Sequence, residues 1–350
     1  MLYFATEDTS NRIRRHNLTM SAKIDKIIAR LQEKTAEGQY YEAQQQTRVV
    51  AARYIKQANY PAAIDILYNV SSSLLKAGQG GSGGDLGLFM IEVYGLAEVK
   101  PDAISKGRVL TLLRLFEEGE PVRKKFIGEM IGWSAKHGPY PAGEPELHHV
   151  AGSLYAQEHE VYDAERHLTL GTKDSPAIFT NLEYEWYTQD DSHTAALYAA
   201  RAVFPYLLIG NVRDARQSLR LFTSRLTDEN AGLTVQSLSS GSEDVKIYPS
   251  LPLLNFLGLL LLAVQKGSAD LYRQLRQKYA THLKEVGGWD EALVTVGEMY
   301  FGIQRPRQGN PLLDMMGSMF GGGMGGMGGG AQPKGQKRVG QGAPVAEGLD

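Results

Sequence analysis

The sequence predicts an all-α protein, an α-solenoid assembled from tetratricopeptide-like helical hairpins. Along most of the chain, apolar residues recur with the three- and four-residue spacing of one helix face, and almost no stretch alternates with the period of two that is typical of strands. A degenerate repeat, in which a turn residue and a hydrophobic residue precede an acidic or small residue and an alanine, occurs four times. Repeats of this kind, with periods of about 34–40 residues, are typical of stacked hairpins.

The repeat explains why the hairpins must stack. Two copies lie in GQYYEAQQQTRVVAARYIKQANYPAAIDIL at residues 38–67, and looser copies are HEVYDAE at 159–165 and GNVRDAR at 210–216. The turn residue is expected to end one helix, the hydrophobic residue to pack back as the next begins, and the alanine to lie where two backbones approach closely. One hairpin cannot bury its apolar face alone, so each needs its neighbours.

Caps and prolines predict where individual helices begin. Asp85 is the expected N-cap of one helix, and Ser175 with Pro176 opens another. We expect about fourteen helices in all, and prolines mark further starts; these are Pro121, Pro145 and Pro252. The expected apolar faces are, in chain order, Ile24, Ile27, Ile28 and Leu31; Ala43, Val50, Ala51 and Tyr54; Ile66, Leu67, Val70 and Leu74; Leu86, Phe89, Val93 and Leu96; and Phe126, Met130 and Trp133.

Two segments interrupt the helical pattern. KAGQGGSGGD at 76–85 is expected to be a glycine-rich loop between helices. Residues 227–252 form a long polar break with two short β-prone runs, LTVQSL and VKIYP, and are expected to form a small hairpin or irregular loop that projects from the solenoid. The predicted organisation is a disordered extension at 1–19, solenoid halves at 20–150 and 151–305, and a Met- and Gly-rich, disordered tail at 306–350.

Composition excludes several classes of function. The formal net charge is −2, so no global field attracts nucleic acid or an anionic membrane. The chain has no cysteine, which excludes disulfides, thiolate zinc sites and iron–sulfur clusters. Its most apolar run, at 251–265, is shorter than the roughly 20 residues that span a bilayer, so we expect a buried core helix there.

No catalytic, cofactor or metal site is predicted. GGSGG at 80–84 matches the nucleophile-elbow pattern, but a helix precedes it where an elbow needs a strand. His159, Asp163 and His167 have the spacing of ligands on one helix, but His159 occupies the turn position of the repeat. The acid–base candidates for an enzyme, on a helix whose pattern indicates a solvated face, are Glu183, Glu185 and Asp190.

One stripe of side chains is a candidate protein-binding surface. Two consecutive tyrosines at a hairpin turn cannot both point into the core, and an exposed tyrosine beside arginine is typical of binding hot spots. An ordinary solvated helix face is the alternative interpretation. The residues are Tyr40, Tyr41, Gln44, Arg48, Arg53 and Lys56.

Five segments together resemble the Golgi-to-ER traffic protein 4 family over about residues 20–322. They are GQYYEAQQQTRVVAARYIKQANYPAAIDIL, LLKAGQGGSGGDL, IEVYGLAEVKPD, YDAERHLTLGTKDS and LLDMMGSMFGG. The resemblance implies a right-handed, non-enzymatic solenoid without cofactors in the cytosol. It also implies that the N-terminal half binds the dimeric ATPase that carries tail-anchored clients, and that the C-terminal half holds a ubiquitin-like-domain protein, which links the chain indirectly to a tetratricopeptide co-chaperone.

The resemblance assigns roles to individual residues. By position, the stripe from Tyr40 to Lys56 becomes the ATPase-docking face, and Asp85 becomes the acidic residue that acts on the nucleotide state of the ATPase. Lys56 stands where the family pattern suggests arginine, and lysine cannot pair bidentately with a carboxylate. The 227–252 insertion matches the family's clamp in place and length, and its candidate contacts are Val245, Ile247, Tyr248, Leu251 and Leu253.

The predicted function is therefore that of a scaffold. It would bridge the targeting ATPase and the ubiquitin-like partner and promote client hand-over for insertion into the ER membrane, without itself inserting into a membrane or binding nucleic acid. The alternative is a generic tetratricopeptide-like adaptor subunit of another multiprotein complex.

Overall fold

The structure is a computed structural model that describes residues 21–240 and 243–304. The expected extension at 1–19 and the expected tail at 306–350 lie outside the described residues. The division of the solenoid into halves at residue 150 stays a prediction.

Helices make up most of the described chain. A helix over residues 21–36 precedes α2. The helices that follow are α2 (Tyr40–Lys56), α3 (Tyr60–Lys76), α4 (Gly80–Leu96), α5 (Ala103–Leu113), α6 (Pro121–His137), α7 (Pro145–Gln157), α8 (Val161–Thr169), α9 (Ser175–Tyr187), α10 (Ala195–Leu208), α11 (Val212–Glu229), α12 (Pro252–Lys266), α13 (Ala269–Lys278), α14 (Ala280–Val286) and α15 (Asp290–Phe301). A short 3₁₀ turn (Ser192–Thr194) precedes α10. The predicted all-α solenoid is confirmed.

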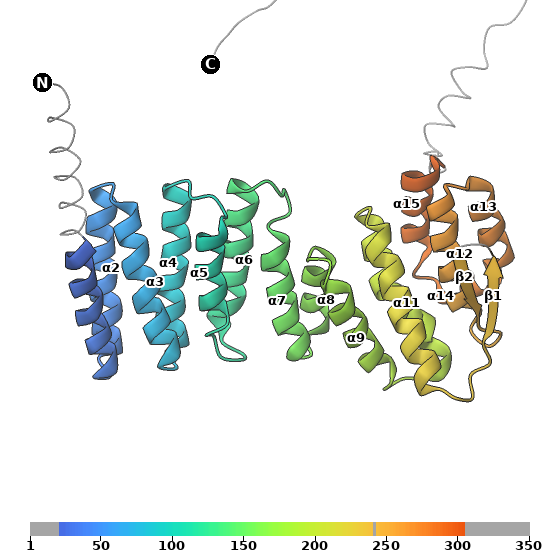
Figure 1. Ribbon diagram of the computed structural model, residues 1–350, viewed down its shortest axis with the longest axis horizontal. Coiled ribbons are helices and arrows are strands. Elements are labelled where there is room, and N and C mark those ends of the chain that lie inside the picture. The colour runs from blue at the N-terminus through green and yellow to red at the C-terminus, as the bar shows by residue number, and fades with distance from the viewer. Residues whose placement is uncertain (1–20, 241–242, 305–350) are drawn as a thin grey trace, which may run out of the picture. The chain divides into compact units, whose positions relative to one another are not determined.

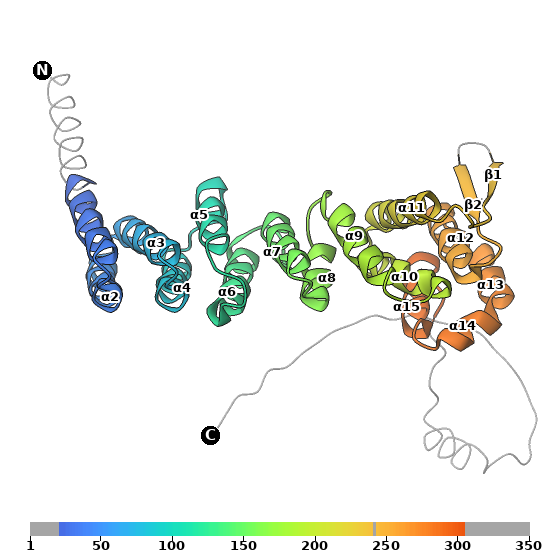
Figure 2. The same cartoon turned by 90° about the horizontal axis from the view of Figure 1, so that it is seen from below.

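The helices form two layers. Figure 2 shows α3, α5, α7, α9 and α11 in one layer and α2, α4, α6, α8 and α10 in the other, and Figure 1 shows the same helices stacking one after another. Contacts join neighbours within each layer, such as α2 with α4 and α4 with α6, as well as the two helices of each hairpin. Each hairpin therefore completes its core with its neighbours, as a solenoid requires.

The turns between the first helices recur at a constant spacing of 20 residues. Left-handed backbone occurs at Gly38, Ala58, Gly78 and Glu98. Each of the first three precedes a helix of 17 residues. His159 and Gly210 occupy the same turn position before α8 and α11. Left-handed backbone reverses the chain after a helix, so the repeat in the sequence is a repeat of hairpin turns.

The predicted glycine-rich loop at 76–85 is wrong. Residues from Gly80 onward form the first turns of α4, and Asp85 is a mid-helix residue, since the N-cap of α4 is Gln79. The glycines permit close packing: a Cβ on Gly83 would lie 2.7 Å from Leu75 Cγ, and one on Gly84 would lie 2.7 Å from Val122 Cγ1. Glycine is present there because neighbouring helices approach too closely for a side chain.

The predicted helix starts are otherwise close. The prolines at 121, 145 and 252 open α6, α7 and α12. The helix α9 begins at Ser175, one position earlier than predicted, because Asp174 and not Ser175 is the N-cap. The apolar run at 251–265 falls in α12, whose side chains are largely buried, so the predicted core helix is confirmed. Within the described ranges, no helix combines the length and apolarity needed to cross a membrane.

A small β-hairpin interrupts the helices between α11 and α12, as predicted. Strands β1 (Gln236–Ser240) and β2 (Glu243–Ile247) pair antiparallel, with Leu238 opposite Val245. Its base is anchored by Asn255 of α12, whose Oδ1 accepts from the Tyr248 N–H at 2.7 Å and whose Nδ2 donates to the Tyr248 carbonyl at 2.8 Å. Both polar groups of the Tyr248 backbone are thus satisfied in a buried place.

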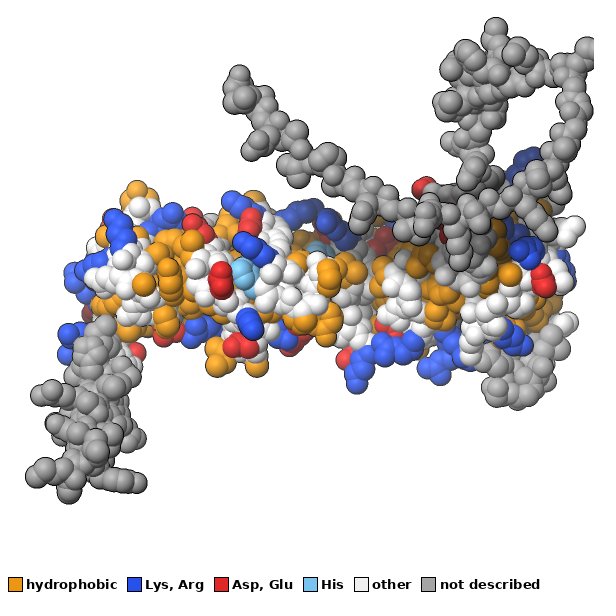
Figure 3. All heavy atoms as spheres, turned by 90° about the horizontal axis from the view of Figure 1, so that it is seen from above, with side chains coloured by type: hydrophobic (Ala, Val, Ile, Leu, Met, Phe, Trp, Pro, Cys, Tyr) orange, Lys and Arg blue, Asp and Glu red, His pale blue; other side chains and the backbone are white. Residues whose placement is uncertain are grey.

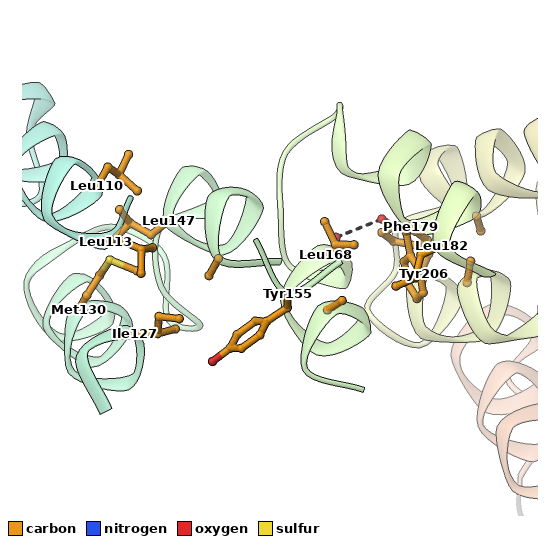
Figure 4. Close-up of a cluster of buried hydrophobic side chains, with 14 of the residues drawn as sticks. Leu110, Leu113, Ile127, Met130, Leu147, Tyr155, Leu168, Phe179, Leu182 and Tyr206 are labelled. Carbon is orange, nitrogen blue, oxygen red and sulfur yellow. Dashed lines mark hydrogen bonds between the residues drawn. The ribbon is translucent and has the colours of Figure 1, made fainter. Parts of the chain in front are cut away.

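The core lies between the two helix layers and passes from one hairpin to the next. Figure 4 shows a part of it, where apolar side chains of α5 to α10 gather. The hydroxyl of Tyr206 in α10 donates to the Leu168 carbonyl of α8 at 3.0 Å. The labelled core residues are Leu110, Leu113, Ile127, Met130, Leu147, Tyr155, Leu168, Phe179, Leu182 and Tyr206.

Candidate partner-binding surface

Side chains of α2 and α4 meet in a small polar cluster. Asp85 Oδ2 accepts from Arg48 Nη1 at 2.7 Å and from Gln44 Nε2 at 2.8 Å, and Ser82 Oγ donates to Gln44 Oε1 at 3.1 Å. Gln44 and Arg48 are four residues apart, so they share one face of α2. The structure therefore brings three predicted site residues together; we call Gln44, Arg48, Ser82 and Asp85 the Arg48–Asp85 cluster.

The Arg48–Asp85 pair is open to solvent. The side chains of Arg48 and Asp85 are 43% and 40% exposed. The Arg48 guanidinium lies 5.1 Å from the centre of the Phe89 ring, a cation–π arrangement that orients it. Pairs this exposed contribute little to stability, so a partner carboxylate can replace Asp85 at Arg48 at small cost.

The two tyrosines at the start of α2 differ in environment. Tyr41 is 68% exposed, whereas Tyr40 packs partly against the core. The prediction that both cannot point inward is confirmed. Tyr41 precedes Gln44 by three residues and Arg48 by seven, so it lies on the same stripe of α2. An exposed tyrosine next to this polar cluster has the composition of a binding hot spot.

Arg53 and Lys56 lie away from this cluster. Both are exposed in the last turn of α2. At 100° per residue, Arg53 is about 140° around the helix from Arg48. The Arg53 guanidinium lies 5.7 Å from the ring centre of Tyr54. Their positive charges interact favourably with the C-terminal end of the helix dipole, and the structure does not bring them to Asp85.

The candidate contacts of the C-terminal half have mixed exposure. Tyr248 is 2% exposed and Leu251 is also buried, so both belong to the core beneath the β-hairpin. Ile247 is half-buried, Leu253 packs against the core, and Val245 lies in β2. Tyr248 and Leu251 thus anchor the hairpin rather than offer a free surface.

A cavity lies beside these residues. It has a volume of about 430 Å³ between α11, α12 and the β-hairpin, and its lining includes Leu219, Thr223, Lys246, Tyr248 and Leu261. Leucines and Tyr248 supply the apolar part of these walls, hydroxyl and amide side chains the polar part, and Arg216, Arg220 and Lys246 are its basic side chains. Such a mixture suits an apolar segment of another protein.

A second groove was not predicted from the sequence. It has a volume of about 480 Å³ and continues from Arg48 and Asp85 between α4 and α6. Phe89 and Trp133 line it together with charged side chains of both helices. The signal in the sequence was the spacing of Phe89 and Glu92, four and seven residues after Asp85, which places them on the same face of α4.

His159 does not lie on the helix α8 that carries Asp163 and His167. His159 has left-handed backbone at the turn before α8, as its repeat position predicts. Instead, Nδ1 of His148 and Nδ1 of His167 lie 3.0 Å apart, and His148 Nε2 donates to the Ala142 carbonyl at 3.0 Å. His167 Nδ1 is therefore the donor in the pair. Among the described residues there is no group of three metal-binding side chains.

The acidic residues of α9 are not all solvated, contrary to the sequence interpretation. Glu183 has an exposed fraction of 0%, because α8 and α10 pack over it. Burial, with the Glu165 carboxyl nearby, raises the pKa of Glu183 to about 9. Arg201 Nε lies 3.2 Å from Glu183 Oε2 and also pairs with Glu165. This cluster lies in the helix packing and lines neither the groove nor the cavity described above.

Several known proteins match this chain. The family model of Golgi to ER traffic protein 4 matches residues 57–320. Golgi to ER traffic protein 4 of Aspergillus fumigatus is 54% identical over 346 residues, which are 95% of this chain and 100% of that protein. Its Schizosaccharomyces pombe counterpart is 33% identical over 305 residues, 87% of this chain and 96% of that protein. The crystal structure of C. therm. Get4 superposes with a TM-score of 0.80 at 60% identity, over 86% of this chain and 96% of that chain.

The fold defines a helical-repeat protein of the α-solenoid class. The chain belongs to the Golgi to ER traffic protein 4 family. It is a non-enzymatic component of Golgi-to-ER traffic.

Proposed function

We propose that this chain is a cytosolic scaffold for tail-anchored membrane proteins. It bridges the ATPase that targets these clients and a ubiquitin-like-domain partner, so that the client is handed over for insertion into the ER membrane. Family membership and two separate candidate binding surfaces, one on α2 and α4 and one beside the β-hairpin, support this proposal.

The Arg48–Asp85 cluster supports the proposed contact with the ATPase in the N-terminal half of the chain. Its charges are already paired inside the chain, so an incoming acidic group of the ATPase competes with Asp85 for Arg48. Asp85 released from Arg48 becomes available to a basic group of the ATPase. This exchange gives Asp85 a physical route to the ATPase, and added salt weakens the contact because the pair is solvent-exposed.

The cavity beside the β-hairpin supports the proposed contact with the ubiquitin-like partner in the C-terminal half of the chain. A segment of the ubiquitin-like partner fits between α11, α12 and β2, with apolar side chains against Leu219 and Leu261 and an acidic group near Lys246. The anchored base of the hairpin, held by Asn255, keeps one wall of the cavity in place. Two partners held on one scaffold then meet at a raised effective concentration.

The experiment separates Arg48 from the other basic residues of α2. Arg48→Glu is expected to weaken ATPase binding by tenfold or more, because it repels both Asp85 and the acidic group of the ATPase. Arg53→Glu, on another side of the same helix, is expected to weaken binding by threefold at most. Binding constants from titration calorimetry with the purified ATPase, with circular dichroism to verify folding, provide the measurement.

The same variants also test the two-surface arrangement. Arg48→Glu should leave the affinity for the ubiquitin-like partner within twofold of the parent chain. An unchanged ATPase affinity of a folded Arg48→Glu chain would refute the assignment of this surface.

A further inference from the structure

The groove between α4 and α6 runs along both helices. The two helices are parallel: Gly84 faces Val122, Gly87 faces Phe126, and the rings of Tyr94 and Trp133 are 4.9 Å apart. The lining extends from Asp85 to Gly95 on α4 and from Lys125 to His137 on α6. At a rise of about 1.5 Å per residue, each wall is about 15–18 Å long. That length accommodates about three turns of a helix.

The floor of the groove is open at two glycines. Gly95 of α4 and Gly132 of α6 both line it, and a Cβ at either position would meet no atom within 4 Å. Neither has the left-handed backbone that favours glycine. Glycine inside a helix is less favourable than alanine, and no contact of the described chain requires it at these positions. The two glycines therefore leave space in the groove for the backbone of another molecule.

Charged side chains line the groove in a defined order. Lys125 lies near the Arg48–Asp85 end, Glu92 and Glu129 lie in the middle, and Lys136 lies at the far end. All four are exposed, and within residues 21–240 and 243–304 none of them forms an ion pair. The groove therefore presents a basic, acidic and basic pattern over an apolar floor that contains Phe89 and Trp133.

No single charge dominates the neighbouring surface. Figure 3 shows apolar, basic and acidic side chains interspersed over the α2–α6 part of the molecule. A partner is thus selected by the order of its charges rather than by its net charge.

We propose that this groove receives a helix of the targeting ATPase about three turns long, with acidic, basic and acidic residues along one side. This inference rests on the proposed function, and it adds α6 to the docking surface. The groove is continuous with the Arg48–Asp85 cluster, so one partner reaches both. The acidic residues of the helix lie against Lys125 and Lys136, its basic residue lies against Glu92 and Glu129, and small side chains face Gly95 and Gly132.

The first test fills the groove. Gly132→Leu is expected to weaken binding of the purified ATPase by tenfold or more, because the added side chain occupies the space of the incoming helix. Gly107→Leu is the matched control, since Gly107 is an exposed helical glycine on α5 with no atom within 4 Å of a Cβ. It should bind within twofold of the parent chain. Both variants are expected to melt no lower than the parent, because leucine favours helix over glycine.

The second test needs no added bulk. Glu129→Lys is expected to weaken ATPase binding threefold or more at low salt, and Glu285→Lys on α14 is the control with an unchanged affinity. The chain has no cysteine, so Lys136→Cys offers a single attachment point for a photo-crosslinker. The crosslink should map to a helix of the ATPase with the stated order of charges.

The outcomes distinguish this inference from the proposed function. If Arg48→Glu weakens binding while Gly132→Leu and Glu129→Lys leave it unchanged, the helix-in-groove inference is overturned and the proposed function stands. If Arg48→Glu also has no effect, the proposed function itself fails. Should Gly132→Leu melt below Gly107→Leu, Glu129→Lys and the crosslink decide, and a crosslink to a loop counts against the inference.

Discussion

The two candidate binding surfaces differ in how their polar groups are held. At the N-terminal surface, Arg48 and Asp85 pair in the open, each with two-fifths of its side chain exposed. At the C-terminal surface, Tyr248 and Asn255 are buried and bonded to each other twice. Exposed pairs exchange partners at little cost, whereas buried ones do not. The first surface can thus rearrange its ion pair when another charge approaches, whereas the base of the second keeps a fixed geometry.

The largest expected effect is a loss of stability when Asn255, which anchors the base of the β-hairpin at the C-terminal surface, is removed. Asn255→Ala leaves the Tyr248 N–H buried without a partner, whereas the Tyr248 carbonyl keeps the bond from the Leu251 N–H. The loss of both Asn255 bonds should lower the free energy of unfolding by about 2–3 kcal/mol. Urea unfolding measures this, and Asn181→Ala, at an exposed site, should change it by less than about 0.5 kcal/mol. If both variants lose the same free energy of unfolding, the base of the β-hairpin is not held more firmly than an exposed site, and the contrast between the two surfaces fails.

The next effect concerns the packing beneath the N-terminal surface. Gly83→Ala places a Cβ 2.9 Å from the Leu75 backbone nitrogen, which cannot move aside alone, and should cost about 1–3 kcal/mol. Gly81→Ala, two residues away with open space around it, should instead stabilise the chain by up to about 1 kcal/mol. Thermal melts of the pair measure the difference. If Gly83→Ala destabilises the chain and Gly81→Ala stabilises it, glycine is required in α4 where neighbouring helices touch it. A change of stability in the same direction in both variants would contradict this explanation.

A pH-dependent effect lies between the two surfaces, at the α7–α8 hairpin. Burial, with His148 and Arg166 nearby, lowers the pKa of His167 to about 4. The unfolded chain therefore binds this proton more readily, and stability falls as pH drops from about 6.5 towards 4. His167→Gln should reduce this fall by about 1–2 kcal/mol, as denaturant unfolding at pH 7 and pH 5 would show. A fall of the same size in both chains would contradict the assignment.

The smallest expected effect on stability lies at the exchangeable pair. Asp85→Asn should change the free energy of unfolding by less than about 0.5 kcal/mol, because the ion pair is solvent-exposed. Its effect should appear in the response of the ATPase, measured as nucleotide hydrolysis with and without the scaffold. A large loss of stability would show that this pair is structural, and the comparison between the surfaces would fail.

Local patterns predicted most of the fold. Caps and prolines placed the starts of α6, α7, α9 and α12 within about a residue, because these features act between residues close in sequence. The glycine segment at 80–84 was misread as a loop because its close contacts are with Leu75 and Val122, and the second of these is distant in the chain. Glu183 was assigned to a solvated face for the same reason, since its burial depends on α8 and α10.

The candidate site was predicted in part. Gln44 and Arg48 share a helix face by spacing alone, but their contact with Asp85 needs α2 and α4 side by side. The position of Arg53 on another side of α2 could also have been predicted, because five residues after Arg48 correspond to a rotation of about 140° around the helix. Tyr248 and Leu251 resembled binding residues in a polar insertion, and only the packing of the hairpin base revealed that they are core.

The turns of the first hairpins carry an architectural consequence. Left-handed residues at 38, 58, 78 and 98 divide this part of the chain into equal units of one helix and one connection. A hairpin of two such units can be duplicated or deleted as a block, and the faces of the remaining helices keep their orientation. The Arg48–Asp85 cluster joins two of these units, since Arg48 lies on α2 and Asp85 on α4. A hairpin added before α2 would leave the cluster whole, whereas one inserted between α2 and α4 would separate its two charges, so the turn period also sets where this part of the chain can be lengthened.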